Sequence, residues 1–314
     1  MTQSKSPATP LRVGVVGLGV MGKNHARVLS ELPGVTLVGV ADPDQAQVEF
    51  VTSRLGCAGF ASLEALLDAG IDALTVAAPT QLHTAISLAA IARGVHVLVE
   101  KPIAHTVEEG RRIIDAAEKA GVTLMVGHVE RFNPAVQSIR QAIAGDDILS
   151  IQITRVGPFP PRMGEVGVVI DLAVHDIDII RHLTGSEIVE VQPQLARTRA
   201  EREDTALLQF RLDNGVIAHI TTNWVTPYKT RTLQVATKTK FIVADLITRQ
   251  VTEYFGQQPD GSYSTKMLNS WPAEPLKKEL EAFARAIHTG ETPAVTGEDG
   301  LRNLEVALRC LGEH

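Results

Sequence analysis

The start of the chain places a glycine-rich turn between an apolar strand and a helix. Leu11–Val16 is a short apolar run typical of a buried parallel strand. A helical segment that ends near Leu32 comes next, and a second apolar strand, Val35–Ala41, follows it. The turn between the first strand and the helix reads Gly17-Leu18-Gly19-Val20-Met21-Gly22. Glycines at this spacing permit a tight turn, let the backbone approach a pyrophosphate and allow close helix–strand packing. This order therefore predicts a parallel α/β sheet that binds a dinucleotide at the amino end of the helix.

An acidic residue, Asp42, ends the second strand. It lies about twenty residues beyond the last glycine, where a carboxylate accepts hydrogen bonds from the adenosine ribose. The alternative is a turn residue, since Asp42-Pro43-Asp44 is also a good entry to a helix. No arginine follows to neutralise a 2′-phosphate, so we expect the cofactor NAD, not NADP. Together with Asp42, the residues predicted to bind it in the turn are Gly17, Gly19, Val20, Met21 and Gly22.

Helices and apolar strands continue to alternate up to residue 127. The helices are expected at residues 62–69, with Ser62 as N-cap, 81–93 and 106–120, and the strands at 71–77, 95–99 and 122–126. A charged pair before proline, Glu100-Lys101-Pro102, stands at the carboxyl end of one strand, where sheets of this type bind ligands. The cofactor site is accordingly expected to include Pro79, Thr80, His83, Glu100, Lys101 and His128.

Strand-like segments dominate the chain after residue 148. A connecting helix is expected to end near Ala144, followed by strands at 148–156, 188–196, 205–212, 216–224, 230–237, 240–246 and 250–255. Asp213-Asn214-Gly215 is a hairpin signal, and the short spacings favour an antiparallel sheet. Two helices are expected near the end, the second opening at Thr296 with Asp299 as its capping partner. The prediction is a Rossmann domain at 11–127 and an α+β substrate-binding and oligomerisation domain, with an open-faced, mostly antiparallel sheet, at 128–314.

Residues 170–182 are predicted to form a buried helix with a polar stripe. At roughly 100° per residue, Asp171, His175, Asp178 and His182 project within about 60° of one another. Isoleucine, leucine, valine and alanine fill most of the other directions. The stripe could be a catalytic site or a hydrogen-bonded feature that fixes the helix. A metal site is the third alternative, but no further ligand cluster of definite spacing supports it, and we expect none.

Composition excludes several classes of protein. The chain of 314 residues, with 44% hydrophobic residues and a formal charge of −6, favours two globular domains and argues against nucleic acid as a partner. Cys57 and Cys310 give neither a disulfide framework nor a ligand spacing. Residues 1–10 are polar and are expected to form a disordered tail and not a signal peptide. No apolar run reaches membrane-spanning length, so we expect no membrane association and a cytoplasmic protein.

Several of these motifs together resemble one enzyme family. The glycine turn with Asp42, the triplet Glu100-Lys101-Pro102, and Asp171 with His175 four residues later resemble the glucose–fructose oxidoreductase/inositol dehydrogenase (Gfo/Idh/MocA) family. Residues 126–134, 156–162 and 223–229 are similar, more narrowly, to its UDP-N-acetylglucosamine 3-dehydrogenase branch. The resemblance implies a Rossmann domain, followed by an open-faced sheet that binds sugar and often builds homodimers or homotetramers.

The resemblance also implies a reaction, the oxidation of the 3-hydroxyl of UDP-N-acetylglucosamine by NAD. We expect His175 to be the base, because imidazole titrates near neutrality, with Asp171 to orient it. Lys101 would stabilise the reacting oxygen, although in this family the lysine is also a candidate for the base. The residues expected at the substrate are Lys101, Arg131, Asn133, Arg162, Asp171, His175, Tyr228 and Lys229, with Arg155 and Arg231 as further cations for a diphosphate.

Other functions stay open at this point. The 3-keto sugar, UDP-2-acetamido-3-keto-glucose, would feed a 3-amino sugar pathway through a PLP-dependent aminotransferase. The substrate could instead be a uronate nucleotide sugar or a free polyol such as inositol. A dinucleotide-binding regulator without catalysis is less expected, because Lys101, Asp171 and His175 are all present.

Overall fold

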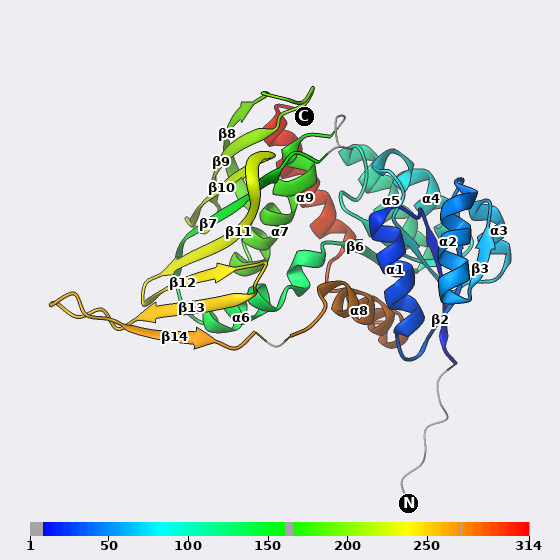
Figure 1. Cartoon of the computed structure of the whole chain (residues 1–314), viewed down its shortest axis with the longest axis horizontal. Helices are drawn as coiled ribbons and strands as arrows, with labels where there is room; N and C mark the ends of the chain where they lie inside the picture. Colours follow the sequence, from blue (N-terminus) through cyan, green and yellow to red (C-terminus); the bar gives the residue numbers. More distant parts are fainter. Residues whose placement is uncertain (1–8, 161–165, 271, 314) are drawn as a thin grey trace, which may run out of the picture. The chain divides into compact units, whose positions relative to one another are not determined.

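The computed structural model describes residues 9–160, 166–270 and 272–313, and the chain divides into two compact units (Figure 1). The first unit runs to His128 and also includes Leu276–Leu301, and the second comprises Val129–Pro275 and the chain from Arg302 onward. This division differs from the predicted domains, because α8 (Pro275–Thr289) and the beginning of α9 (Gly297–Leu311) lie in the first unit. The reason is that α8 buries the side chains of Leu280 and Phe283, which the sequence alone does not assign to either core.

The first unit is built on a six-stranded parallel sheet with the order β3-β2-β1-β4-β5-β6. The chain passes from β1 outward to β2 and β3 and then returns to β4 on the other side of β1, as in a doubly wound Rossmann sheet. Its strands are β1 Leu11–Val16, β2 Val35–Ala41, β3 Ala58–Phe60, β4 Ala73–Val76, β5 His96–Glu100 and β6 Leu124–Gly127. The predicted fold is confirmed, although the short β3 has no apolar run that would have located it in the sequence.

Helices α2, α3 and α5 of the first unit begin at polar caps. Ser62 accepts a hydrogen bond from the backbone of Ala65 at 3.2 Å, as predicted, and Asp44 and Thr106 cap in the same way. The helices are α1 Val20–Glu31, α2 Gln45–Leu55, α3 Leu63–Asp68, α4 Thr80–Ala92, α5 Val107–Ala120 and α8. The predicted capping box before α9 is also present, because Thr296 and Asp299 each accept a hydrogen bond at 3.0 Å from the other's backbone.

The second unit contains an eight-stranded sheet with the order β14-β13-β12-β11-β7-β10-β9-β8. All neighbouring strands are antiparallel except β7 and β10, which are parallel. The strands are β7 Ile148–Pro158, β8 Ile188–Ala196, β9 Thr205–Leu212, β10 Ile217–Asn223, β11 Val225–Thr237, β12 Lys240–Asp245, β13 Gln250–Phe255 and β14 Ser264–Leu268. The predicted hairpin between β9 and β10 is confirmed, with Gly215 at a φ of 86°.

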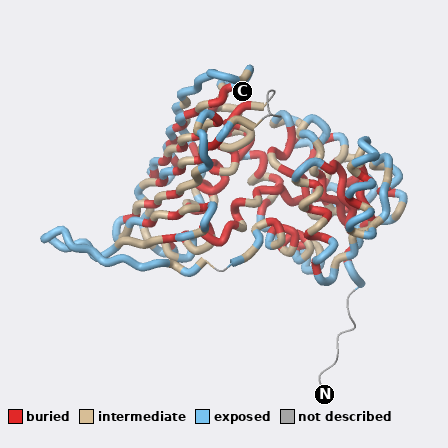
Figure 2. Tube along the Cα trace, viewed as in Figure 1, coloured by how far each residue is buried: buried red, intermediate tan, exposed pale blue. Residues whose placement is uncertain are grey.

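One face of this sheet is covered and the other is open. Along β9, Ala206, Leu208 and Phe210 are buried on the covered face, and the residues between them are exposed (Figure 2). Helices α6 (Pro134–Ala142) and α7 (Val174–Thr184) and the end of α9 pack on the covered face, and the part of the chain that the structure describes puts no helix on the other (Figure 1). The expected open-faced sheet is therefore present.

Several smaller expectations can be compared with the structure. Cys310 is buried, and burial raises the pKa of its thiol to about 12, whereas Cys57 is half-buried. None of the helices within the described ranges is both long and apolar enough to cross a membrane. Residues 1–8 of the predicted tail lie outside the described residues.

Candidate active site

The turn between β1 and α1 requires glycine at two of its positions. A Cβ atom on Gly17, whose φ is 85°, would lie 2.5 Å from the backbone nitrogen of Ala78, and one on Gly22 would lie 1.7 Å from the carbonyl oxygen of Gly17. At Gly19 a Cβ would meet nothing within 4 Å, and the next residue, Val20, is 76% exposed. Gly19 is the N-cap of α1 and no side chain caps the helix. The first amides of α1 therefore lie beside open space, as a pyrophosphate site requires.

Asp42 joins this turn to the entry of α2. Its Oδ2 accepts a hydrogen bond from the backbone of Leu18 at 2.6 Å, and its Oδ1 accepts one from Asp44 at 2.8 Å. The turn interpretation is therefore confirmed, because this carboxylate lies against the glycine turn and shapes the start of α2, and the contact with the ribose stays a prediction. Each carboxylate oxygen has a further lone pair, so Asp42 keeps the capacity to accept hydrogen bonds from ribose hydroxyls. The turn and Asp42 together fit NAD.

The loop after β4 brings Pro79 and Thr80 to the amino end of α4, where Pro79 is the N-cap. His83 lies one turn further on and is only 1% exposed. Its Nδ1 bonds the carbonyl oxygen of Pro102 and its Nε2 bonds that of Ala78, both at 2.9 Å. His83 therefore lies between the loops that follow β4 and β5, with a backbone carbonyl oxygen at each ring nitrogen. The predicted direct contact between His83 and the cofactor is not supported, because its ring is buried and both nitrogens face these carbonyl oxygens.

Glu100 and Lys101 stand at the end of β5. Glu100 is buried, and its Oε1 accepts a hydrogen bond from Nε2 of His25 at 2.8 Å. Burial raises the pKa of the Glu100 carboxyl, but the hydrogen bond and charge of His25 and the charge of Lys101 more than offset this and lower it. Glu100 is thus an ionised internal residue and not an exposed cofactor ligand, whereas Lys101 is half-buried.

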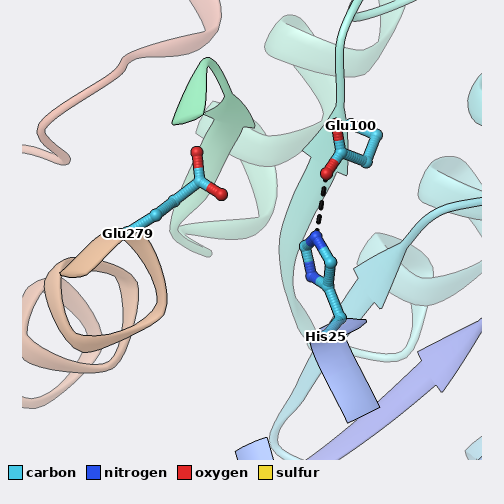
Figure 3. A group of neighbouring side chains, drawn as sticks. All are labelled: His25, Glu100 and Glu279. Atoms are coloured by element: carbon cyan, nitrogen blue, oxygen red, sulfur yellow. Dashed lines mark hydrogen bonds and ion pairs between the residues drawn. The ribbon is translucent and has the colours of Figure 1, made fainter. Parts of the chain in front are cut away.

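A third ionisable side chain, Glu279 of α8, faces this pair (Figure 3). The candidate ligand atoms of His25, Glu100 and Glu279 lie within 4.8 Å of one another, and they form the one group in the described ranges with a donor set for a metal ion. No metal was expected from the sequence. Within this group Nε2 of His25 and Oε1 of Glu100 are bonded to each other at 2.8 Å, and the described residues give Nδ1 of His25 no hydrogen-bond partner. His128, the last predicted cofactor residue, is 1% exposed beside β6, so it too lies inside the protein.

In the second unit the predicted polar helix is present but is not a uniform α-helix. Residues Val169–Ala173 form a π-helix that continues directly into α7. Asp171 lies in the π-helical turn and His175 in the first turn of α7, and both are half-buried. The projection at 100° per residue does not apply through a π-helix. The sequence analysis therefore overestimated how closely the four polar side chains align along the helix. A π-helical turn within a helix is frequently found at functional sites.

The remaining acidic residues of α7 are held in buried ion pairs. The single Nε–H of Arg131 is shared between both carboxylate oxygens of the fully buried Asp178, at 2.8 and 2.9 Å, and Nη2 donates a further hydrogen bond at 2.7 Å. Asp176, also fully buried, accepts three hydrogen bonds from Arg155 in the same way, at 2.8 to 3.0 Å. Both arginines thus make bidentate pairs that fix α7 on either side of Ile177. The sequence missed Asp176, because it projects away from the predicted stripe.

A short helical turn before α6 completes this network. Glu130 accepts hydrogen bonds from Arg155 and Arg231, both at 3.1 Å, and from Asn133 at 3.0 Å. Burial raises the pKa of Glu130, but these partners more than offset it and lower the pKa. Arg131, Asn133 and Arg155, all expected at the substrate, therefore make their described hydrogen bonds inside the protein, and their buried side chains do not suit a diphosphate.

Three predicted cations and a tyrosine remain as substrate candidates. The side chain of Arg231 is 37% exposed. Burial lowers its pKa, together with the charge of Arg155, while Glu130, Asp176 and Asp171 act in the opposite direction, so Arg231 lies within electrostatic reach of Asp171. Lys229 and Tyr228 are exposed on β11, and Lys229 passes over Gly157, where a Cβ would lie 3.3 Å from its Cγ. Arg162 lies outside the described residues.

Two family models match the chain in the order of its units. The oxidoreductase family with an NAD-binding Rossmann fold matches residues 11–128, and the GFO/IDH/MocA C-terminal domain matches residues 137–242.

Individual relatives point to two kinds of substrate. A UDP-N-acetylglucosamine 3-dehydrogenase of Acidithiobacillus ferrooxidans is 30% identical over 95% of this chain and 96% of its own. A solved structure of that enzyme has a TM-score of 0.90 and covers 95% of this chain and 96% of the other. A scyllo-inositol 2-dehydrogenase (NAD(+)) of Bacillus subtilis is also 30% identical, over 95% of this chain and 92% of its own. Sequence identity therefore does not separate a nucleotide sugar from an inositol.

Proposed function

The chain belongs to the GFO/IDH/MocA family of NAD-dependent oxidoreductases, and from that premise we propose that it oxidises the 3-hydroxyl of UDP-N-acetylglucosamine. The reaction removes a hydride from C3 and a proton from the hydroxyl and leaves a ketone. The glycine turn and Asp42 would hold NAD, and its nicotinamide would accept the hydride. The product is UDP-2-acetamido-3-keto-glucose.

The protein must take the hydroxyl proton and hold the oxygen while charge develops on it. We assign the proton to His175 and the hydrogen bond to the reacting oxygen to Lys101, whose positive charge stabilises the developing alkoxide. Asp171 stands one turn before His175 and orients or shares its proton. If the two roles are reversed and Lys101 is the base, removing either residue still costs most of the turnover.

The exposed part of Arg231 is the observation that carries the nucleotide-sugar assignment. The charge of Asp171 acts on this cation. Arg155, by contrast, donates its hydrogen bonds to Asp176 and Glu130 inside the protein. A diphosphate would use N–H groups of Arg231 other than the one bonded to Glu130, with Lys229 as a second cation. An inositol carries no charge that these residues could neutralise. The close structural relationship to a UDP-N-acetylglucosamine 3-dehydrogenase supports the same choice.

The assignment is tested by trapping the ketone. Because oxidation of a secondary alcohol by NAD is usually uphill at neutral pH, the assay contains protein, NAD, UDP-N-acetylglucosamine and either a trapping amine or a PLP-dependent aminotransferase with its amino donor. We expect a product derived from the loss of two hydrogens in the mass spectrum. In Arg231→Met the KM for the nucleotide sugar should rise about tenfold or more, as loss of a charge-assisted hydrogen bond implies. Arg93→Met, an exposed arginine of the first unit that pairs with Asp68, is the matched control.

The inositol alternative rests on the equal identity of the Bacillus subtilis relative. It predicts turnover of scyllo- or myo-inositol with NAD, and an Arg231→Met variant with unchanged KM for that substrate. Turnover of inositol without any trapped nucleotide-sugar product would replace the present assignment. A UDP-uronate, the third candidate, is distinguished in the same assay by adding it as the substrate.

We also propose that the chain forms a homo-oligomer through the open face of its second sheet. Leu207, Ile217 and Phe241 are exposed there by 49%, 58% and 40%, and they lie on three different strands of one face. Exposed apolar side chains on several strands of one sheet face favour contact with another protein surface. Light scattering of the wild type should give a dimer or tetramer, and Ile217→Lys should shift it towards the monomer.

A further inference from the structure

Two buried histidines hold the residues on either side of Lys101, and we propose that His25 and His83 are positioning residues for its amine. The inference rests on the proposed role of Lys101 in the reaction. Residue 100 is held by His25 from α1, and residue 102 is held by His83 from α4. All of these groups lie in the first unit.

The His25 side of this arrangement is a chain of two hydrogen bonds. Because a carboxylate only accepts, Nε2 of His25 carries the proton that it donates to Oε1 of Glu100 at 2.8 Å (Figure 3). The second oxygen of Glu100 accepts the backbone N–H of Lys101 at 3.3 Å. His25 is 0% exposed, so water does not compete with this bond. The imidazole thereby fixes Glu100, and Glu100 fixes the backbone from which the lysine side chain departs.

The space around Glu100 admits few other positions for its carboxylate. A Cβ on Gly127 of β6 would lie 3.1 Å from Oε2 of Glu100, so the side chain packs directly on that glycine. Glu279 of α8 faces the pair from another direction (Figure 3). A buried carboxylate is tolerated only while it keeps donor partners, so Glu100 needs the bond from His25 where a second carboxyl group lies close to it.

The His83 side acts on the peptide after Lys101. Both partners of His83 are carbonyl oxygens, which only accept, and a neutral imidazole has one N–H. Burial lowers the pKa of His83, which favours this neutral form. The neutral ring therefore donates to Pro102 or to Ala78 but not to both at once. A proton on Nδ1 holds Pro102, and through it the Lys101 backbone.

The same two helices also present the cofactor loops. Gly19 and Val20 open α1, which carries His25, and Pro79 and Thr80 open α4, which carries His83. The backbone of Lys101 is thus connected to the helices that bind the dinucleotide. The same two helices therefore position both the lysine amine and the cofactor. Misplacement of a catalytic group by about 1 Å costs roughly a hundredfold in rate, which sets the size of the expected effect.

The first test compares His25→Leu with His25→Gln. The amide nitrogen of glutamine can take the place of Nε2, whereas leucine leaves Glu100 without its donor. We expect kcat to fall about a hundredfold in His25→Leu, to stay within a few-fold of wild type in His25→Gln, and the affinity for NAD to change little in either. Equal losses in both variants, or wild-type turnover in His25→Leu, would overturn the proposal.

The second test uses His83 and does not depend on the folding of a His25 variant. Asparagine places an N–H near Nδ1 and keeps the bond to Pro102, while glutamine places one near Nε2 and keeps the bond to Ala78. We expect His83→Asn to retain turnover and His83→Gln to lose it about tenfold to a hundredfold, at similar melting temperatures. If the two variants behave alike, His83 is only a structural link and the proposal fails for it.

A third measurement is independent of any substrate. Hydrogen exchange of the peptide covering residues 98–105 should be about tenfold faster in His25→Leu and unchanged in His25→Gln, because the Lys101 amide donates to Glu100. This result would support the positioning role even if UDP-N-acetylglucosamine proves not to be the substrate. Unchanged exchange in His25→Leu would contradict it. So would one equivalent of a divalent metal in the purified wild type that is lost in Glu279→Gln, because His25 would then be a ligand.

Discussion

The two units hold their candidate catalytic residues by different physical means. In the first unit Lys101 follows a buried parallel strand, and the groups that fix it come from helices packed on the same sheet. In the second unit His175 lies on a helix whose neighbours Asp176 and Asp178 are held by arginines 21 and 47 residues earlier in the chain. One position follows from a local strand–turn–helix order, and the other depends on buried charges that meet only after folding.

This difference matters for how each unit tolerates change. A strand end in a parallel sheet is supported by many backbone hydrogen bonds, so loss of one side chain leaves the strand in place. A buried bidentate ion pair is different, because removing one partner leaves the other charge without compensation. We therefore expect local changes in the first unit to affect mainly catalysis, and changes to the ion pairs of the second unit to affect mainly stability.

The largest effect should come from the catalytic residues themselves. Lys101→Met and His175→Asn should each lower kcat about a hundredfold to ten-thousandfold while NAD affinity stays nearly unchanged, because both groups act on the reacting oxygen. Steady-state kinetics and fluorescence titration with NADH measure the two quantities. If both variants keep wild-type turnover, Lys101 and His175 are structural residues. The difference between the two units would then say nothing about catalysis.

The second effect concerns the ion pairs of α7. Arg155→Met should lower the free energy of unfolding by about 3–5 kcal/mol, because Asp176 is left buried without its partner. The control is Arg93→Met, whose exposed pair with Asp68 should contribute little to the free energy of unfolding. The double variant Arg155→Met with Asp176→Leu should recover much of the loss. Urea unfolding measures all three, and equal effects of the two single variants would remove the contrast between the units.

The third effect tests the glycine turn of the first unit. Asp42 places a carboxylate where a 2′-phosphate would have to bind, and like charges in a partly buried site cost on the order of a kcal/mol or more. NADPH should therefore bind about tenfold or more weakly than NADH. Asp42→Ser should bring the affinities for NADH and NADPH closer together. Tight binding of NADPH by the wild type would refute the assignment of NAD as the cofactor.

The smallest effect is a dependence of stability on pH that both units share. The folded-state pKa values of Glu100 and Glu130 are both lowered, so their stabilisation is complete above the glutamate pKa of the unfolded chain, about 4.3, and is lost as the pH falls through the folded values. Glu100→Gln and Glu130→Gln should each flatten the acid side of the stability curve. Unfolding curves in urea at a series of pH values would show a steep acid side in both variants if neither glutamate contributes.

The comparison also explains which parts could be predicted from the sequence. The glycine turn, Asp42 and the place of Lys101 are encoded in contiguous residues, and the hairpin at Gly215 likewise needs only local geometry. The polar stripe at 170–182 was found by periodicity, but its π-helical turn was not, because the pattern assumed an α-helix throughout.

Residues that act across long distances in the chain could not be found in this way. No local pattern pairs Arg155 with Asp176, or His25 with Glu100, which are 75 residues apart. For the same reason Arg131 and Arg155 were expected at a diphosphate, since the sequence shows their charge but not the carboxylates that neutralise it. A buried partner for each arginine could be inferred only from the fold.

The most direct test of the proposed reaction follows one hydrogen atom. UDP-N-acetylglucosamine carrying deuterium at C3 is incubated with the protein, NAD and a ketone trap, and the NADH formed is analysed by mass spectrometry. Our account predicts NADH that contains the deuterium, and unlabelled NADH from substrate that carries deuterium at C4 instead. Unlabelled NADH from the C3 substrate, or labelled NADH from the C4 substrate, would contradict oxidation at the 3-hydroxyl.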